Sequence, residues 1–243
     1  MQSSSSGNER NRGKNPGDDK LFGTARMQTR LKSAVDDLSL LLSRGYPPRS
    51  SLALVGNRHR LNIRQQKAVQ GMSAADSQVT QRTKCSLPLQ ALAGKEVNID
   101  GFNVLILLES LLSGAYIFKG VDGFYRDLSS VHGSYKRVKQ TSQAIEFVSE
   151  FHKQAGLEKI HWYFDKPVSN SGRLKQWIEE TAQQQHFNWE VTLSYAPDKD
   201  IAASSAIAIT SDAWVLDNVK QNFNLIGYAV SILNPASVFN PDS

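Results

Sequence analysis

The sequence predicts an α/β fold, in which a mostly parallel sheet flanked by helices follows a small basic helical module. Before about residue 96, apolar residues recur at helical spacing, whereas short apolar strands alternate with helices after it. The charge changes in the same place. Residues 1–96 hold 16 Lys and Arg against 7 Asp and Glu, while residues 97–243 hold 12 against 16. A chain of 243 residues is long enough for a domain with such an attached module.

The N-terminal part divides into a tail and a helical module. Residues 1–22 have almost no apolar side chains, so we expect a disordered tail that is dispensable for folding. The basic helical module covers residues 23–84. Its first helix, 25–43, carries an apolar stripe made of Leu31, Val35, Leu38 and Leu42. Two shorter helices are expected around residues 52–55 and 63–71, followed by a loosely ordered connection over residues 72–83.

Residues 85–243 are expected to form the α/β domain. The helices that we expect lie at residues 104–112, 143–155, 172–185 and 213–222. The strands that we expect lie at residues 97–100, 116–119, 160–165, 189–195, 206–210 and 228–233. Strands that alternate with helices favour a parallel sheet.

The composition argues for a cytoplasmic protein that contacts a polyanion. The longest apolar run, residues 104–108, is too short to span a bilayer, and the N-terminus has no apolar segment typical of a signal peptide. A single cysteine, Cys85, fits a reducing compartment. A net charge of +9 before residue 97 indicates that the module supplies most of the affinity for nucleic acid, although a solvated basic surface would have the same composition.

Aspartates at the ends of apolar runs are the main functional signal. Asp100, Asp165 and Asp212 each end or closely follow an expected strand, and Asp198 and Asp200 follow the strand 189–195. In an open α/β sheet the carboxyl ends of the strands form one edge, where ligands bind. Carboxylates gathered there repel one another unless a cation neutralises them, and Mg²⁺ or Mn²⁺ prefers such oxygen ligands. The pattern therefore predicts a metal-dependent site that acts on phosphates.

Two groups of motifs resemble known families of unknown function. Residues 42–47 (Leu-Ser-Arg-Gly-Tyr-Pro), 54–58 (Leu-Val-Gly-Asn-Arg) and 61–62 (Leu-Asn) resemble domain-of-unknown-function family 434. Residues 99–104 (Ile-Asp-Gly-Phe-Asn-Val), 122–127 (Asp-Gly-Phe-Tyr-Arg-Asp), 132–135 (His-Gly-Ser-Tyr) and 164–169 (Phe-Asp-Lys-Pro-Val-Ser) resemble the domain usually fused to it. This resemblance implies membership and little about activity.

A wider resemblance suggests an activity. Asp-Gly-x-Asn after the first strand, Phe-Asp after a middle strand and Thr-Ser-Asp after a late strand are similar to motifs of the PIN/NYN class of metal-dependent ribonucleases. That class has a Rossmann-like sheet whose acidic residues hold Mg²⁺ or Mn²⁺ for phosphodiester cleavage. Asp100, Asp165 and Asp212 match the acidic positions, and either Asp198 or Asp200 fills another. The segment 122–132 departs from the pattern.

The resemblance implies the catalytic set Asp100, Asp165, Asp200 and Asp212, with Asp198 as a further metal ligand. Candidate substrate-binding residues are Asn103, Arg126, Arg173, Arg58 and Arg60, because guanidinium and amide groups suit phosphate oxygens. Each has a structural alternative as a capping, turn, ion-paired or solvated residue. His132 is a further candidate, as a proton shuttle or a turn residue.

The resulting functional hypothesis is a metal-dependent nuclease that acts on RNA. Two alternatives stay open: an inactive PIN-like scaffold that binds RNA or a protein, and a nucleotide phosphohydrolase that uses the same carboxylate edge. A P-loop kinase is disfavoured because the chain has no Gly-x₄-Gly-Lys-Ser/Thr motif.

Overall fold

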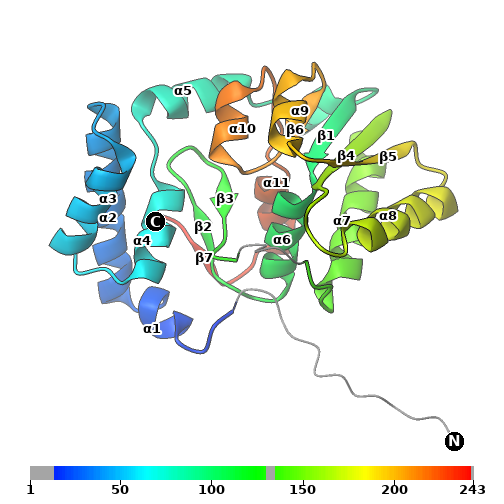
Figure 1. The fold of residues 1–243 in the computed structure, drawn as a ribbon. Helices are drawn as coiled ribbons and strands as arrows, with labels where there is room; N and C mark the ends of the chain where they lie inside the picture. The colour runs from blue at the N-terminus through cyan, green and yellow to red at the C-terminus, as the bar shows by residue number, and fades with distance from the viewer. Residues whose placement is uncertain (1–13, 130–134, 242–243) are drawn as a thin grey trace, which may run out of the picture.

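The centre of the α/β domain is a four-stranded parallel sheet with strand order β5-β4-β1-β6 (Figure 1). The computed structural model describes residues 14–129 and 135–241. The strands are β1 (Glu96–Asp100), β4 (Lys159–Asp165), β5 (Trp189–Ser194) and β6 (Ile207–Ile209). The prediction of a mostly parallel sheet flanked by helices is thus confirmed.

The two faces of this sheet differ because its side chains alternate. On one face, Ile99, Trp162 and Phe164 are fully buried. They pack in the main core against helices α6 (Gly101–Leu112), α7 (Gln140–Ala155), α8 (Ser171–Gln185) and α11 (Leu225–Leu233). The other face carries a smaller apolar cluster under the short helices α9 (Pro197–Ala203) and α10 (Ala213–Asn218). This lightly covered face leads to the edge where the predicted aspartates lie.

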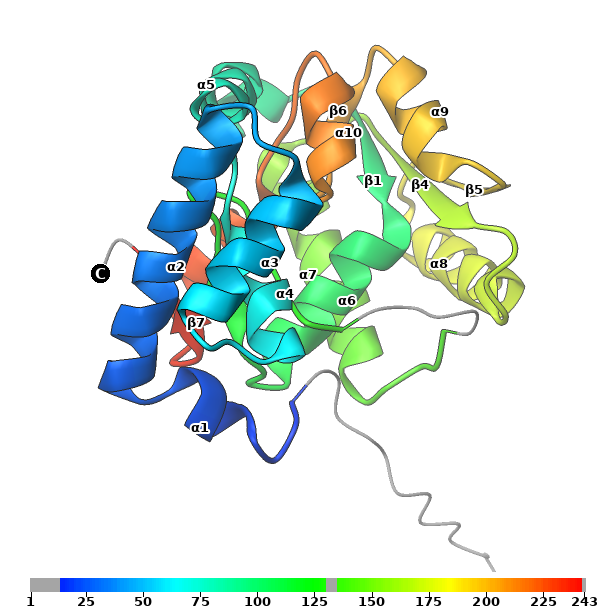
Figure 2. The same cartoon turned by 60° about the vertical axis from the view of Figure 1, so that its left-hand side comes forward.

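The helical module packs against a second, three-stranded sheet. The module consists of α1 (Asp18–Phe22), α2 (Ala25–Ser43), α3 (Pro48–Arg58) and α4 (Ile63–Met72). The second sheet, order β3-β2-β7, consists of β2 (Ile117–Lys119), β3 (Tyr125–Arg126) and β7 (Val238–Phe239). Their side chains form one shared core, in which Phe22 and Leu31 meet Phe118 and Phe239. Figure 2 shows the module alongside β7.

The module helices form where their sequence patterns predict. Leu31, Val35 and Leu38 of the apolar stripe in α2 are buried, and Thr24 caps the helix by accepting from the Met27 N–H. Asn62 begins α4 with a reciprocal capping box, in which Gln65 bonds back to the Asn62 backbone. The helices expected at residues 25–43 and 63–71 are therefore confirmed within a residue.

Three segments differ from the predictions. The structure has helix α1 at Asp18–Phe22, inside the expected disordered tail, because Phe22 reaches the shared core and Asp18 pairs with Arg64. The expected loose connection contains helix α5 (Asp76–Cys85), and a short 3₁₀ turn (Leu89–Leu92) follows it. The strand expected at residues 228–233 is the helix α11, which begins at the cap Asn224. A short apolar run fits a strand or a buried helix equally well.

Arg82 on α5 joins three parts of the chain. Its side chain is 2% exposed and bonds Asp122, in the turn between β2 and β3, at 2.6 Å from Nη1. The same guanidinium bonds Asp217 on α10 at 2.6 Å from Nε and 2.9 Å from Nη2. Burial lowers the pKa of Arg82, but hydrogen bonds and charges from Asp217 and Asp122 more than offset this and raise it overall. The arginine is therefore charged and fully committed to these contacts.

Asp122 holds a second guanidinium. Arg126 bonds both Asp122 carboxylate oxygens at 2.7 Å, and the Phe124 N–H adds a bond at 3.1 Å. Gly120 makes room for this pair, since a Cβ there would lie 2.5 Å from both Arg126 Nη1 and Asp122 Oδ1. Although burial raises the pKa of Asp122, Arg126 and Arg82 lower it below its usual range. Arg82, Asp122, Arg126 and Asp217 are called the buried ion network below.

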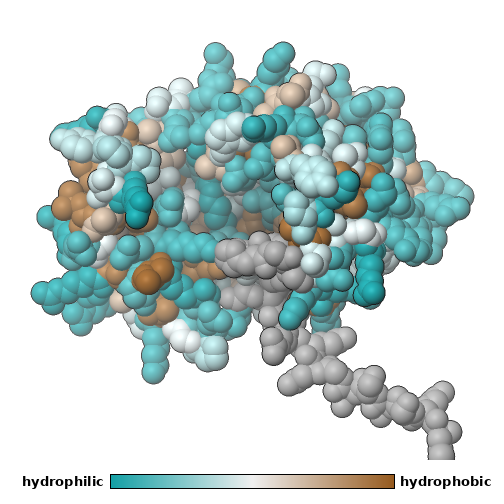
Figure 3. All heavy atoms as spheres, in the orientation of Figure 1, coloured by the Kyte–Doolittle hydropathy of each residue, from teal (hydrophilic) through white to brown (hydrophobic). Residues whose placement is uncertain are grey.

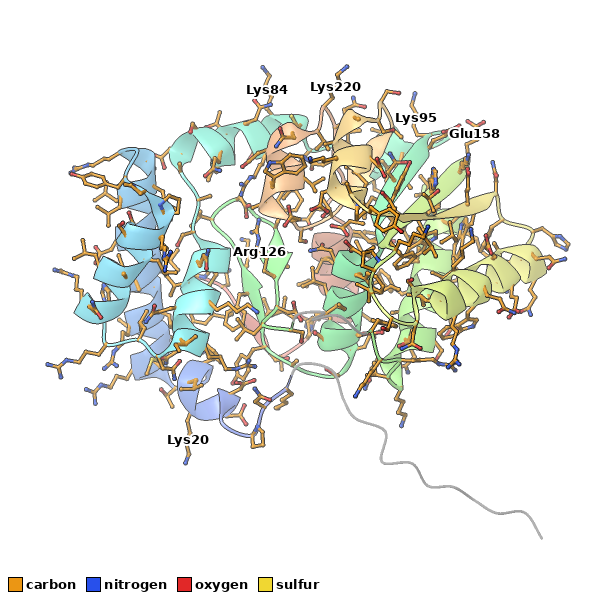
Figure 4. All side chains as sticks on the ribbon, viewed as in Figure 1. Lys20, Lys84, Lys95, Arg126, Glu158 and Lys220 are labelled. Atoms are coloured by element: carbon orange, nitrogen blue, oxygen red, sulfur yellow. The ribbon has the colours of Figure 1, made fainter. Side chains whose placement is uncertain are left out.

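We expect Arg82→Ala to lower the free energy of unfolding by about 3–5 kcal/mol, because it leaves Asp122 and Asp217 without their shared cation. Denaturant unfolding followed by circular dichroism measures the change. Lys84→Ala is the matched control on the same helix, since the Lys84 side chain is exposed and points outward (Figure 4). The control should stay within about 0.5 kcal/mol of the parent. Equal losses in both variants would contradict a special role for Arg82.

Candidate functional site

The strand order creates a switch point between β1 and β6. These two strands are neighbours in space, but one opens the sheet in sequence and the other closes it. Ligands of open α/β sheets bind in the crevice outside the carboxyl ends of the strands at such a point. Asp100 ends β1, and Thr210, Ser211 and Asp212 follow β6 directly. Two of the predicted site residues therefore meet at this crevice.

Asp100 is a buried carboxylate at the base of the crevice. It is 7% exposed and accepts a hydrogen bond of 2.7 Å from the Thr210 hydroxyl. Burial raises its pKa to about 7, and the nearby charges of Asp198 and Asp212 also raise it, against the lowering effect of Thr210 and the Asn103 backbone. A carboxyl with this pKa is half ionised near neutral pH. A bound cation would stabilise the negatively charged form and so keep this carboxyl ionised.

Asn103 is an organiser of the loop after β6. Its Oδ1 accepts from the Ser211 N–H at 2.8 Å, while the Thr210 hydroxyl accepts from the Asp212 N–H at 3.0 Å. These bonds tie the start of α6 to the start of α10. Asn103 thus has a structural role, because its side chain connects two loops. Its contact with substrate stays a prediction.

Gly101 explains part of the Asp-Gly-x-Asn motif. An added Cβ would lie 2.2 Å from Cε1 of Phe164, which is fully buried on β4. A larger residue would push Phe164 or the start of α6 aside. Gly101 therefore lets α6 begin directly after Asp100 at close distance to β4.

Asp165 and Asp198 extend the acidic edge beyond Asp100 and Asp212. Asp165 ends β4, and burial raises its pKa. Asp198 lies in the first turn of α9, where burial first, and then the charges of Asp212 and Asp165, raise its pKa. Asp212 caps α10 by accepting from the Val215 N–H at 3.0 Å, so its capping alternative is realised too. We call Asp100, Asp165, Asp198 and Asp212 the acidic edge.

Asp200 has a different local role from Asp198. Its carboxylate accepts a hydrogen bond from the hydroxyl of Ser194 at the end of β5. Of the two carboxylates on α9, Asp198 is the one whose charge couples to Asp212 and Asp165. This favours Asp198 as the further acidic position left open by the sequence.

The acidic edge does not form a ready-made cage for a metal ion. Within residues 14–129 and 135–241, no three His, Cys, Asp or Glu side chains lie close enough together to hold one. Mg²⁺ commonly binds through one or two carboxylates and keeps several waters, to which substrate phosphates add. The residues fit this hydrated mode, with Asp100 and its neighbours as ligands, and they do not fit a closed site with three protein ligands.

A groove of about 440 Å³ runs between the helical module and the switch point. Asn103, Ser211 and Asp212 line one side, while Lys67, Gln70 and other residues of α4 line the opposite side. Arg82, Arg126 and Asp127 form part of its wall. In Figure 3 the surface recedes between the module and the α/β domain. We call this the interdomain groove; it gives a ligand at Asp212 a basic residue of the module to contact.

The predicted basic residues are found in different surroundings. Both terminal nitrogens of Arg126 bond Asp122, so the ion-pair alternative holds and its role as a phosphate contact loses support. Figure 4 shows Arg126 between the module and the α/β domain. Arg58 is exposed and lies 3.1 Å from Asp37, and Arg60 is exposed after α3. Neither lines the interdomain groove. Arg173 is exposed on α8, and His132 lies outside the described residues.

Several residues of this region were missed by the sequence reasoning. Thr210 is signalled only by its place before Ser211-Asp212, whereas Lys67 carries no local signal because it comes from another part of the chain. Tyr195 and Trp214 are large aromatic residues left 76% and 47% exposed beside Asp198 and Asp212. The carboxylate of Asp217 is likewise occupied by Arg82, a pairing across 135 residues of sequence. Exposure and tertiary pairing are not visible in a single sequence.

The chain belongs to the family described as Domain of unknown function (DUF5616), which matches residues 89–228. The family described as Protein of unknown function (DUF434) matches residues 30–84, which confirms that resemblance. A similar protein is the uncharacterized protein MJ0935 of Methanocaldococcus jannaschii, which is 30% identical over 205 residues, or 84% of this chain and 98% of the relative. No solved structure matches the chain. In the described ranges, no helix is long and apolar enough to cross a membrane.

We expect Asp100→Asn to raise Tm at pH 8 and to change it much less at pH 5. Unfolded aspartate has a pKa near 4, whereas folded Asp100 has a pKa of about 7. The folded state therefore binds this proton more tightly, and the stability linked to it is lost as pH rises from about 4 through 7. Asparagine removes that loss.

Thermal unfolding in EDTA at the two pH values measures the effect. Asp36→Asn, at an exposed position on α2, is the control and should show no such pH dependence. A Tm gain for Asp100→Asn that is equal at pH 5 and pH 8 would show that the pKa of Asp100 in the folded protein is not raised to about 7.

Proposed function

We propose that this protein is a metal-dependent nuclease that acts on RNA in the cytoplasm, with Mg²⁺ or Mn²⁺ held at the acidic edge. The observation that carries the proposal is the gathering of carboxylates at the switch point, where burial and then the charges of Asp198 and Asp212 raise the pKa of Asp100. Like charges gathered in a crevice favour a divalent cation. The similarity of the Asp-Gly-x-Asn, Phe-Asp and Thr-Ser-Asp motifs to PIN/NYN ribonucleases supports the same activity. The free thiol of Cys85 suits the reducing environment of the cytoplasm.

The chain's own residues have distinct parts in this proposal. When bound, the cation supplies charge neutralisation at the phosphate and lowers the pKa of water. Asp100 and Asp212 would hold it, and Asp165 and Asp198 would accept hydrogen bonds from its waters. Thr210 keeps the Asp100 carboxylate in one orientation through its 2.7 Å bond. Asp200 is the weaker candidate because Ser194 occupies it.

The surroundings of the acidic edge suit a single-stranded polymer. The interdomain groove is open and lined by Lys67, whose positive charge also acts on the buried Asp127. Tyr195 and Trp214 are exposed rings that lie close in sequence to Asp198 and Asp212, and Lys166 lies 4.9 Å over the ring of Tyr195. Exposed aromatic rings beside cations bind successive bases by stacking, with little sequence preference. These features favour RNA over a small phosphorylated substrate.

A binding scaffold without cleavage is the second candidate. It is favoured by the finding that no three ligands converge within the described residues and that Asp100 already has a hydrogen-bond partner. Such a protein would keep the groove and the exposed rings but would not use the carboxylates. A variant at Asp100 separates the two functions. In a nuclease it removes cleavage and leaves strand binding intact, whereas in a scaffold it changes neither.

We expect the protein to cleave single-stranded RNA when Mn²⁺ is added, and Asp100→Asn to reduce that cleavage at least about 100-fold, because a principal cation ligand is lost. Gel assays on end-labelled RNA and DNA oligonucleotides measure the rate. A second readout is independent of cleavage: Mn²⁺ should raise the Tm of the parent and leave that of Asp100→Asn unchanged.

Asp36→Asn serves again as the charge-matched control and should cleave at the parent rate. An Asp100→Asn variant with full activity would place the reaction elsewhere. Strand binding without any cleavage, together with a Tm that ignores Mn²⁺, would support the scaffold instead.

We expect Lys67→Ala to weaken RNA binding several-fold and to reduce the salt slope of the binding constant by about 0.7, as for one lost phosphate contact to a single strand. Arg58→Ala and Arg60→Ala test the outer basic face that the sequence suggests. Fluorescence anisotropy at several salt concentrations gives the slopes. Lys84→Ala, exposed on the outside of α5, is the control. An unchanged slope for Lys67→Ala with a reduced one for Arg58→Ala would move the strand from the groove to the outer face.

A further inference from the structure

A second cavity, of about 380 Å³, lies at the start of helix α8. Its size is in the range of small-molecule sites. The lining comprises Tyr135, Lys136, Arg137, Asn170, Arg173, Leu174 and Trp177. We call it the α8 pocket. It lies apart from the interdomain groove, and the two share no lining residue.

The lining combines basic groups with an aromatic ring. Lys136, Arg137 and Arg173 carry positive charge, and no acidic side chain is among the described residues that line the pocket. The guanidinium of Arg137 lies 4.2 Å from the centre of the Trp177 ring. Stacking of this kind holds a guanidinium in one place while its edge stays able to donate. Arg173 makes no ion pair with any described residue, so its charge is available at the rim.

The pocket walls are tied together by the backbone. The Tyr135 N–H donates to the Ser169 carbonyl at 3.2 Å, and the Asn170 side chain donates to the Tyr135 carbonyl at 2.9 Å. The buried hydroxyl of Tyr135 bonds Glu109 on α6. The segment before α7 is thereby fastened to the loop between β4 and α8. A ligand would enter a site whose floor is already in place, which lowers the entropy cost of binding.

We propose that the α8 pocket binds a nucleotide, with the base stacked on the Arg137 guanidinium that lies over Trp177 and the phosphate held by Arg173. An anionic group explains the three cations, because guanidinium and ammonium groups recognise phosphate. A flat aromatic group in the ligand explains the stack of Arg137 on Trp177, since bases stack on guanidinium planes and aromatic rings whatever their identity. A nucleotide carries both on one small molecule. The source is either a free nucleotide or the phosphorylated end of an RNA strand.

The position of the pocket relates it to the acidic edge. The loop after Asp165 leads to Asn170, so only residues 166–169 separate an acidic-edge carboxylate from the pocket wall in the chain. We infer that a strand whose end is seated in the pocket would continue along this loop toward Asp165. This link rests on the proposed function, whereas nucleotide binding in the pocket requires no metal ion and no cleavage.

The test is isothermal titration calorimetry of the full chain in EDTA, with adenosine 5′-monophosphate as the probe. We expect saturable binding, and a loss of at least about tenfold in affinity for both Trp177→Ala and Arg173→Ala, in line with one lost stacking or phosphate contact. Trp177→Phe keeps a ring and should stay within about threefold of the parent. Lys220→Ala is the control, because Lys220 is exposed and distant in Figure 4 from α8. Thermal unfolding checks that each variant is folded.

Two further probes identify the source of the nucleotide. A short 5′-phosphorylated RNA that binds more tightly than the monophosphate, and than the same RNA without its phosphate, assigns the pocket to a strand end. A monophosphate that binds as tightly as the RNA assigns it to a free nucleotide.

The proposal is overturned if none of these probes binds at millimolar concentration, or if Trp177→Ala and Arg173→Ala bind like the parent. Nucleotide binding that persists in a protein without cleavage would count against the nuclease and leave the pocket standing.

Discussion

The buried ion pairs of Arg82 are the interaction on which the arrangement of this molecule depends. A buried guanidinium is tolerated only when its charge and donors are fully paired, and here the partners come from the turn after β2 and from α10. The helix α5 that carries Arg82 links the module to the α/β domain. Since Gln78 of the same helix also bonds Asp217, α5 and α10 are held in one register. The buried ion network thus sets where the module lies relative to the sheet.

The candidate site inherits its geometry from that arrangement. Asp212 begins α10, and Asp217 on the same helix binds Arg82. The ion pair therefore fixes the helix that positions Asp212 at the acidic edge. The interdomain groove exists because α4 is held opposite the loop after β6. The basic module thus forms one wall of the groove. In the proposed function it also supplies positive charge for RNA. Removal of the module would expose Phe118 and Phe239, so point variants are cleaner tests than deletion.

Local patterns predicted much of the fold and less of the site. The short apolar run at residues 160–165 predicted β4, and the ends of three strands correctly located Asp100, Asp165 and the loop with Asp212. The apolar run at residues 228–233 has no period that separates a strand from a buried helix, and α5 has too few apolar residues to stand out. The partners of Arg126 and the exposure of Trp214 depend on distant segments, so no local pattern contains them.

The shared core has a consequence for the order in which the chain can fold. Phe22 and Leu31 near the beginning pack in one cluster with Phe239, only a few residues from the end, and β7 pairs with β2. During synthesis the N-terminal helices emerge first, but the apolar cluster that holds them lacks Phe239 until about 200 further residues have been made. Contacts of such long sequence separation form slowly. The module therefore keeps part of its apolar face uncovered until then, and uncovered apolar surface is what makes a partly folded chain prone to aggregate.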